Sequence, residues 1–265
     1  MNKFLEWLAV PMERPQSYSA FHLIFAIVGL AIVVIFAYLL RNLNDKQNKI
    51  LLGVIGAVLA ISEVIKILFN NHIINYDKFA WWVFPYQLCS IPMYLCLICA
   101  FVKSEKFNSW LYEFMFAVGL STSILTLLEP SGLHKDYVFL TCHAYVWHLI
   151  LAFIGLYLFL SKRAGKNILG ILKSSAVLGV VVVIGLILNL CIKEPGFNAL
   201  YMSPYVPSLI VVFDQIWLKA GWVVCDILYV FAIILLSAIF YYSAYFIRKF
   251  IEKTKSKKYK YEYIG

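Results

Sequence analysis

The stretch SAFHLIFAIVGLAIVVIFAYLL, residues 19–40, contains no charged side chain and is long enough to cross the ~30 Å hydrocarbon core of a bilayer as a helix. The whole chain is 63% hydrophobic and only 14% charged, whereas an average soluble domain is roughly 25% charged. Further apolar runs lie at residues 50–69, 82–102, 110–128, 138–161, 168–192 and 222–247. Because backbone polar groups in hydrocarbon must bond internally, such runs predict helices. We therefore expect an all-α polytopic membrane protein with about seven transmembrane helices.

The distribution of Lys and Arg predicts how these helices are oriented. With seven spans, the N-terminal segment and the even-numbered loops share one side of the membrane and hold 6 basic residues. The other side, which includes the C-terminus, holds 15. Basic residues accumulate in cytoplasmic loops, so we expect the N-terminus outside and the C-terminus inside.

The same pattern divides the chain into three regions. They are an interfacial N-terminal segment at 1–18, a seven-helix transmembrane domain at 19–247 and a basic cytoplasmic tail at 248–265. Within the second region, Pro195-Gly196, Pro204 and Pro207 interrupt residues 193–221. We expect this segment to be a re-entrant or lid loop.

Charge and cysteine usage exclude several classes of partner. The formal net charge is +9, but the basic residues lie in short loops and in the tail, so we expect contact with anionic inner-leaflet lipid and no nucleic acid binding. The six cysteines lie within or beside apolar segments and indicate no disulfide framework. Cys96-x-x-Cys99 has no second pair of ligands at a suitable spacing, so we expect no metal site and no cofactor.

Polar residues from five different spans are predicted to gather in the outer half of the bilayer: Glu63, Cys89, His143, His148, Asn189 and Asp226. Ionisable groups at this depth are expensive, so they usually face a cavity or one another and mark function. The alternative is that they join helices structurally, with Glu63 paired to Lys66 three residues later on its own helix.

The third span carries the sequence Phe84-Pro85-Tyr86-Gln87-Leu88-Cys89-Ser90-Ile91-Pro92. Proline cannot donate a backbone hydrogen bond, so we expect a kinked helix whose unbonded carbonyls, together with Gln87, form a polar notch around the thiol. The alternative is a kinked helix in which the cysteine only fills space. In the fifth span, His143 and His148 are five residues apart and point in directions ~140° apart on a helix, so we expect one to serve chemistry and the other to cap a loop or bind a neighbouring carbonyl.

Four motifs occur in order along the chain: Tyr86-Gln87-Leu88-Cys89, Pro130-Ser131…His134, His143…His148 and Asn198-Ala199-Leu200-Tyr201-Met202. In these motifs the chain resembles the YwaF family of bacterial integral membrane proteins. That family is similar to the mammalian transmembrane acyltransferase that makes polyunsaturated ether phosphatidylethanolamine. The likeness covers most of residues 63–226. It implies a cysteine nucleophile matched by Cys89 and a histidine matched by His148, with His143 as the second choice.

The resemblance therefore implies a phospholipid acyltransferase or transacylase that forms an acyl thioester and acts on phospholipids and lysophospholipids. A histidine beside a thiol raises its thiolate fraction, and Glu63 or Asp226 is a candidate to orient that histidine. For the substrate and its oxyanion we expect contacts from Gln87, Asn189, Asn198, Tyr201 and Asp226. The implied location is a bacterial plasma membrane.

A different class of function remains open on the sequence. A transporter or lipid-binding protein without covalent chemistry also explains a polar cavity formed by Glu63, Lys66 and Asp226 in the outer half of the bilayer.

Overall fold

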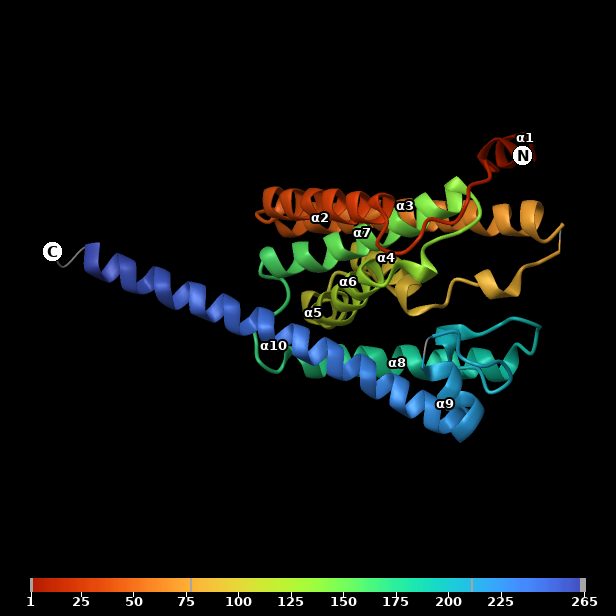
Figure 1. Ribbon diagram of the computed structural model, residues 1–265. Coiled ribbons are helices and arrows are strands. Elements are labelled where there is room, and N and C mark those ends of the chain that lie inside the picture. The colour runs from red at the N-terminus through yellow and green to blue at the C-terminus, as the bar shows by residue number, and fades with distance from the viewer. Residues whose placement is uncertain (1, 77, 211, 263–265) are drawn as a thin grey trace.

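The computed structural model describes residues 2–76, 78–210 and 212–262, and no strand occurs in these ranges. Six helical segments are long and apolar enough to cross a membrane, which confirms the all-α multi-pass prediction. The main helices are α1 (Asn2–Leu8), α2 (Ala20–Leu40), α3 (Asp45–Phe69), α4 (Ile91–Phe101), α5 (Glu105–Phe114), α6 (Ser121–Leu128), α7 (Val138–Leu160), α8 (Gly170–Cys191), α9 (Phe213–Ala220) and α10 (Trp222–Glu262). Figure 1 shows the N-terminus and the C-terminus at opposite ends of the molecule.

The second span begins earlier and ends later than its apolar run. Its first turn is closed by a capping box, in which the Asn44 side chain accepts from the Gln47 N–H and the Gln47 side chain accepts from the Asn44 N–H. The helix therefore starts at Asp45 within the polar loop. At its other end α3 continues into a π-helical turn, η1 (Asn70–Ile74).

The third span is not the continuous kinked helix expected over residues 82–102. After a short 3-10 turn, η2 (Trp81–Val83), the chain is irregular through Gln87 and becomes helical only at η3 (Leu88–Ser90), which leads into α4. The physical reason is that Pro92 lies in the first turn of α4, where a missing N–H breaks no hydrogen bond, so it starts the helix instead of kinking it. This helix of Leu88–Phe101 is too short to qualify as a spanning helix.

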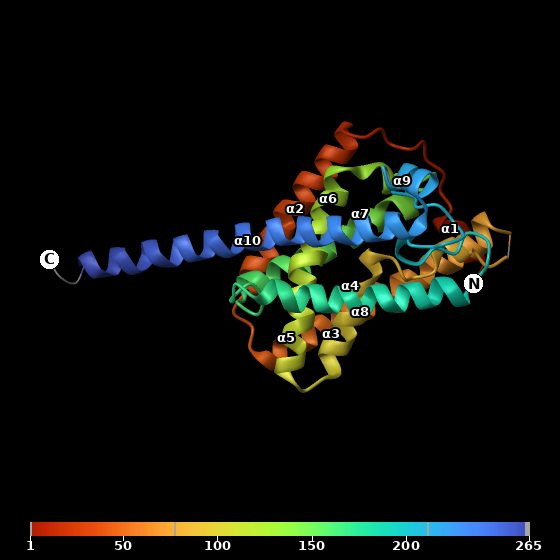
Figure 2. The ribbon, with the colours of Figure 1, turned by 90° about the horizontal axis from the view of Figure 1, so that it is seen from below.

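The fourth span forms the centre of the molecule. It consists of α5, a π-helical segment η4 (Met115–Leu120) and α6, and all six residues of η4 are buried. Helix α7 packs against η4 at Gly155, where an added Cβ would lie 2.6 Å from Leu120 Cβ and 2.8 Å from the Met115 carbonyl oxygen. From below, α8 and α10 lie in front of this central span (Figure 2). Glycine at position 155 therefore permits the close approach that builds the core.

Hydrogen bonds from three side chains hold the loop between α7 and α8, at the end of the bundle away from Cys89. Glu113 of α5 accepts from the Gly165 N–H at 2.9 Å, and the Tyr241 hydroxyl donates to the Asn167 carbonyl at 2.7 Å. Arg248 donates to the carbonyls of Ala164 and Gly165 at 3.0 Å each. These bonds fix the loop between α7 and α8 to α5 and α10, because each uses a backbone group that the loop itself leaves free.

Helix α10 continues through the predicted boundary between membrane domain and tail. It has 41 residues, and no break in the helix falls at residues 247–248. Its last turns extend beyond the other helices in both ribbon views (Figures 1 and 2). At ~1.5 Å per residue α10 is about 60 Å long, twice the thickness of a bilayer core.

The N-terminal segment is tied to the loop before α7. Pro11 and Tyr137 form an isolated antiparallel bridge, in which the Met12 N–H donates to Asp136 O and the Val138 N–H donates to Val10 O. Beside it, Arg14 holds the Asp136 carboxylate with two hydrogen bonds of 2.5 and 2.6 Å. The hydrogen bond and charge of Arg14 keep the pKa of Asp136 below its usual value.

This ion pair predicts a pH dependence of the N-terminal bridge. Because the folded-state pKa of Asp136 is lowered, its contribution is present above the ordinary pKa of aspartate, about 3.9, and is lost as pH falls through the lowered value. We expect Arg14→Ala to accelerate hydrogen exchange at the Met12 and Val138 amides at neutral pH, and the ratio to wild type to approach one in acid. Lys3→Ala, a change on exposed α1, is the control. An Arg14→Ala ratio that stays constant across this pH range contradicts the prediction.

Candidate functional site

Cys89 lies at the start of the α4 helix, within the 3-10 turn Leu88–Ser90. The neighbouring Ser90 side chain is buried. Amides in the first turn of a helix have no partner within the helix, and they carry a partial positive charge. The sequence placed Cys89 inside a kinked helix. The structure instead places it where a thiolate or an oxyanion is favoured by backbone N–H groups.

Helix α7 is attached to the backbone of this cysteine. The Trp147 indole N–H donates to the Cys89 carbonyl oxygen at 3.0 Å. One turn earlier on the same helix, His143 stacks on Trp147 with ring centroids 5.4 Å apart. His148 follows Trp147 directly. The contact therefore brings the two-histidine segment of α7 to the cysteine end of α4.

The two imidazoles have different surroundings. His148 Nδ1 lies 2.7 Å from the Ala144 carbonyl, which can only accept, so we assign the proton to Nδ1 and leave Nε2 with its lone pair. The ring of His143 lies between Phe139 and Trp147, and its buried Nε2 has no hydrogen-bond partner in the described structure. The orienting position expected for Glu63 or Asp226 beside His148 is thus occupied by a carbonyl. Each ring presents a free Nε2, as a proton acceptor requires.

Neither imidazole contacts the thiol directly. Across residues 2–76, 78–210 and 212–262, no hydrogen bond or ion pair joins the Cys89 sulfur to His143 or His148. The structure instead joins the histidine helix to the cysteine segment by the hydrogen bond from the Trp147 indole to the Cys89 carbonyl. In enzymes without substrate such catalytic contacts are often long and shorten only in the complex.

Helix α3 contributes an ion pair to the same end. Lys66 Nζ lies 2.6 Å from Glu63 Oε1, and the Glu63 side chain is only 4% exposed. This is the i, i+3 pair that the sequence offered as the structural alternative for Glu63. Helix α3 packs against both α4 and α7, so the pair lies on a helix that borders the two helices of the candidate site.

The segment after α8 folds back onto the chain before Cys89. The Leu200 N–H donates to Tyr86 O at 2.9 Å, and Gln87 Nε2 donates to Asn198 O at 2.8 Å. Asn189 of α8 clamps Ala199 by donating to its carbonyl and accepting from its N–H. Leu200 and the next residue both have positive φ, a conformation that costs about 1–3 kcal/mol per residue and persists only when surrounding bonds enforce it.

These bonds give Asn189 and Asn198 structural partners. Asn198 Oδ1 accepts from the Ser203 N–H at 2.9 Å, and its Nδ2 donates to Pro207 O at 3.2 Å. Only the Nε2 group of the Gln87 amide is hydrogen-bonded, since Oε1 is buried and has no hydrogen-bond partner in the part of the chain that the structure describes. Substrate contact by these three side chains stays a prediction. Of the three, Gln87 has a free polar atom at the site.

Two tyrosines and a carboxylate lie on the later part of the chain. Tyr201 directly follows Leu200, and Tyr229 lies three residues after Asp226 on α10. Asp226 is 6% exposed, and neither of its carboxylate oxygens has a hydrogen-bond partner within the described ranges. A buried carboxylate without a partner is costly, so it indicates a place where a donor binds.

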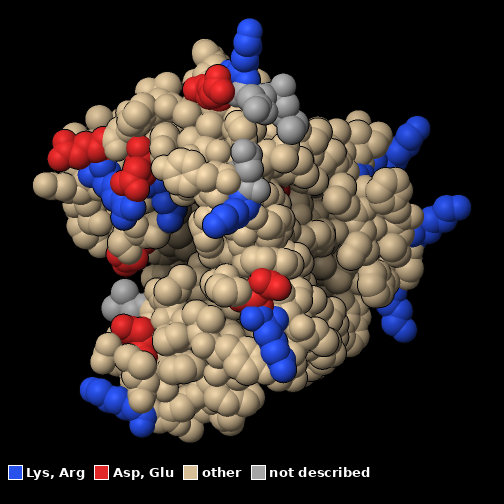
Figure 3. Space-filling model, turned by 90° about the vertical axis from the view of Figure 1, so that its right-hand side faces the viewer, with Lys and Arg blue, Asp and Glu red and all other residues tan. Residues whose placement is uncertain are grey.

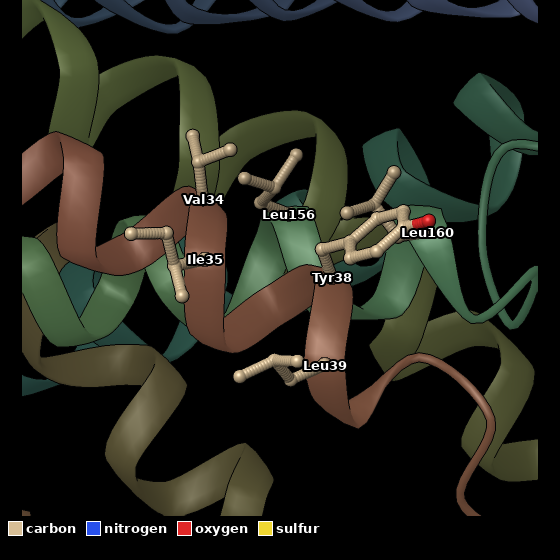
Figure 4. Close-up of a pocket in the computed structure, with 6 residues that line it drawn as sticks. All are labelled: Val34, Ile35, Tyr38, Leu39, Leu156 and Leu160. Atoms are coloured by element: carbon tan, nitrogen blue, oxygen red, sulfur yellow. The ribbon is translucent and has the colours of Figure 1, made fainter.

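A separate apolar groove lies between α2 and α7, away from this chemistry. Its volume is about 440 Å³, and Figure 4 shows its lining residues Val34, Ile35, Tyr38, Leu39, Leu156 and Leu160. Leu156 is eight residues beyond His148, or about 12 Å along the helix. The groove offers no nucleophile or base, so it is not the candidate site.

The end of the molecule that carries α9 and the loop after α8 faces the viewer in Figure 3, where the surface is hollowed near its centre and charged side chains lie around the hollow.

A family model described as the TMEM164 family matches residues 16–241. The chain belongs to the TMEM164 family. This is the family of the mammalian transmembrane cysteine acyltransferase, to which the YwaF family was expected to be similar, and the YwaF label itself stays a prediction. Searches of curated proteins and of solved structures find no match.

In this TMEM164-family protein, one motif residue lies in a second cluster instead of at Cys89. His134 Nε2 is 2.8 Å from the Tyr145 hydroxyl, and the ring packs edge-on against His22. Burial, with His22 as a smaller cause, lowers the pKa of His134, so the imidazole is neutral at physiological pH. Its observed contacts are those of a helix-joining residue.

Sequence reasoning missed three residues of this TMEM164-family site: Ser90, Trp147 and Tyr229. Trp147 offered a signal, since it lies in the middle of a span between two histidines, whereas membrane tryptophans usually lie at the interfaces. Ser90 and Tyr229 offered none, because hydroxyls are common within helices.

Proposed function

We propose that this protein is a membrane-embedded phospholipid acyltransferase or transacylase in which Cys89 carries the acyl group as a thioester. The observation that carries the proposal is the position of Cys89 at a helix start, with its carbonyl bound by Trp147 between two histidines. A helix N-terminus stabilises a nearby anion by about 0.3–1 kcal/mol when exposed and up to ~2 kcal/mol when partly buried. Membership of the TMEM164 family supports the same chemistry.

The first half of the cycle transfers an acyl group to the sulfur. The Cys89 sulfur attacks the ester carbonyl carbon of a phospholipid, and its proton passes to an imidazole Nε2. The carbonyl oxygen becomes an oxyanion, for which the first-turn N–H groups of α4 and the Gln87 amide are the proposed donors. The carbon–oxygen ester bond then breaks. The imidazolium returns the proton to the departing alkoxide, which leaves as a lysophospholipid.

The second half reverses these steps with a different acceptor. The hydroxyl of an incoming lysophospholipid attacks the thioester carbon while imidazole Nε2 takes its proton. The carbon–sulfur bond breaks, the sulfur regains a proton and a new phospholipid leaves. We assign the base to His148, whose Nε2 is the free nitrogen, with His143 as the second candidate. Asn189, Asn198, Tyr201 and Asp226 are proposed to line the substrate site.

The setting of the enzyme is part of the proposal. We place it in a bacterial plasma membrane with the N-terminus outside, the site in the outer half of the bilayer and residues 193–221 as a lid. The basic tail would contact anionic lipid of the inner leaflet.

The test is to trap the thioester. Purified protein is incubated with phospholipid labelled in its acyl chain and no acceptor, and the label on Cys89 is read by peptide mass spectrometry. We expect a hydroxylamine-sensitive adduct on Cys89, strongly reduced in His148→Gln and less affected in His143→Gln. Addition of lysophospholipid should discharge it. Acyl transfer that proceeds with no adduct on any cysteine excludes the mechanism.

A lipid-binding protein without covalent chemistry is the second candidate, favoured by the unpartnered carboxylate of Asp226. It predicts tight retention of phospholipid with neither adduct nor lysophospholipid product.

A further inference from the structure

The apolar groove between α2 and α7 opens on the outer surface of two spanning helices. Both helices are long and apolar enough to cross a membrane, so the medium around the groove is hydrocarbon. The lining side chains that α2 contributes are more than half exposed: Val34, Ile35, Tyr38 and Leu39. With Leu156 and Leu160 of α7 they enclose about 440 Å³ (Figure 4). The groove is therefore open to molecules that are dissolved in the bilayer.

The side chains of the groove favour a flexible chain over a second helix. Helices in membranes associate through small residues, which let their backbones approach closely. Helix α2 uses such residues for its contact with α7, since Ala37 is fully buried and a Cβ added at Gly29 would clash with Leu149. The groove beside this contact is lined by larger side chains, which keep a helix about 10 Å wide away from its floor. An acyl chain is narrower and can follow the groove.

A cation without an ion-pair partner lies at the end of α2 where the groove ends. The Arg41 guanidinium stacks on Tyr38 at 3.5 Å from the ring centroid and donates to the Tyr38 carbonyl. Among the described residues no carboxylate pairs with Arg41, and the nearby Asp45 is held by Arg163. Lys162, just beyond the end of α7, is a second, exposed cation. Arginine has five donors, so Arg41 retains several for a phosphate.

We propose that this groove holds one acyl chain of an anionic phospholipid whose phosphate is bound by Arg41. The chain lies along α2 in hydrocarbon, and the headgroup lies at the membrane surface, where Arg41 and Lys162 complement its charge. Leu160 is twelve residues beyond His148, or about 18 Å along α7. This lipid is therefore a bound component of the membrane domain, separate from any substrate at Cys89, and the proposal does not rest on the proposed function.

The experiment locates the lipid by photolabelling. Full-length protein is placed in phosphatidylcholine nanodiscs that contain a small fraction of phosphatidylglycerol with a diazirine in its acyl chain. After photolysis, labelled peptides are identified by mass spectrometry. We expect adducts on residues 34–39 and 156–160, about fivefold more than with the matched phosphatidylcholine probe, because a basic residue near the membrane surface attracts anionic lipid by about this factor.

A charge variant tests the headgroup contact. Arg41→Gln should lower phosphatidylglycerol labelling of the groove about fivefold and leave phosphatidylcholine labelling unchanged. The unchanged phosphatidylcholine signal shows that the groove is intact in the variant. Lys46→Gln removes an exposed charge at the same end of the molecule and should keep the wild-type labelling. Equal phosphatidylglycerol labelling of wild type and Arg41→Gln overturns the proposal.

A second variant fills the groove. Val34→Phe should reduce labelling of both peptides by both probes, because the larger ring occupies the place of the acyl chain. Val183→Phe is the matched control, since Val183 of α8 is 56% exposed, like Val34 at 54%, and lies outside the groove. Undiminished labelling of residues 34–39 in Val34→Phe, or absence of adducts from both peptides in the wild type, contradicts the proposal.

Discussion

Replacement of Cys89 by alanine is expected to abolish acyl transfer between phospholipid and lysophospholipid. Without the sulfur no thioester forms, and the acceptor hydroxyl must attack an ester directly. In a serine hydrolase, loss of the nucleophile lowers kcat by about 10⁶-fold. We expect a loss of at least about 10³-fold here, measured as labelled product per minute from purified protein in mixed micelles.

The control for this loss is Cys142→Ala. Cys142 is a free, partly exposed cysteine like Cys89 and lies on α7 beside His143. We expect its removal to leave transfer within about twofold of wild type, because no step of the proposed cycle uses it. Near-normal transfer by Cys89→Ala would mean that the nucleophile has been assigned to the wrong residue.

The largest expected effect on stability comes from Gly155→Ala. The new Cβ would meet Leu120 Cβ at 2.6 Å and the Met115 carbonyl at 2.8 Å. A carbonyl within η4 cannot rotate away as a side chain can, so α7 must shift. Overpacking of this kind costs about 1–3 kcal/mol, occasionally more. We expect a melting temperature lower by roughly 5–10 °C, read by thiol-reactive dye fluorescence in detergent.

Gly179→Ala on α8 is the matched control for this substitution. It is the same exchange in a spanning helix, but nothing lies within 4 Å of the added Cβ. Alanine favours a helix over glycine by up to about 1 kcal/mol, so this variant should melt at or above the wild-type temperature. Equal melting of the two variants would show that the α7–η4 contact is looser than described.

Much of the helical architecture could be read from the sequence because the bilayer imposes it. Residues 19–40 predicted α2 nearly to the residue, since an apolar run without partners can only become a helix. The prediction of a continuous helix for the third span was wrong, for a reason that the local sequence does not contain. Its irregular part is bonded by Leu200 and Asn198, more than 100 residues later, so it does not need a helix to satisfy its polar groups.

In the candidate site, a contact within one helix could be predicted from the sequence, whereas a contact between helices could not. Lys66 and Glu63 are three residues apart on a helix, so their pairing follows from helical geometry alone. The bond between Trp147 and Cys89 depends on how α7 is rotated relative to α4, which no local pattern determines. The same rotation places the ring of His143 on the face of the Trp147 indole. His143 had been the second choice, after His148, for the catalytic histidine.

The shortness of α4 bears on how a lipid could meet the sulfur. The helix Leu88–Phe101 spans about 20 Å of a ~30 Å core, so its first residues stop well short of one membrane surface. The ester bonds of a phospholipid sit just beneath the headgroups, at the margin of the hydrocarbon. A nucleophile at the truncated end of this helix lies deeper than that level, so the ester group of a donor lipid must move inward from the headgroup region to reach the sulfur.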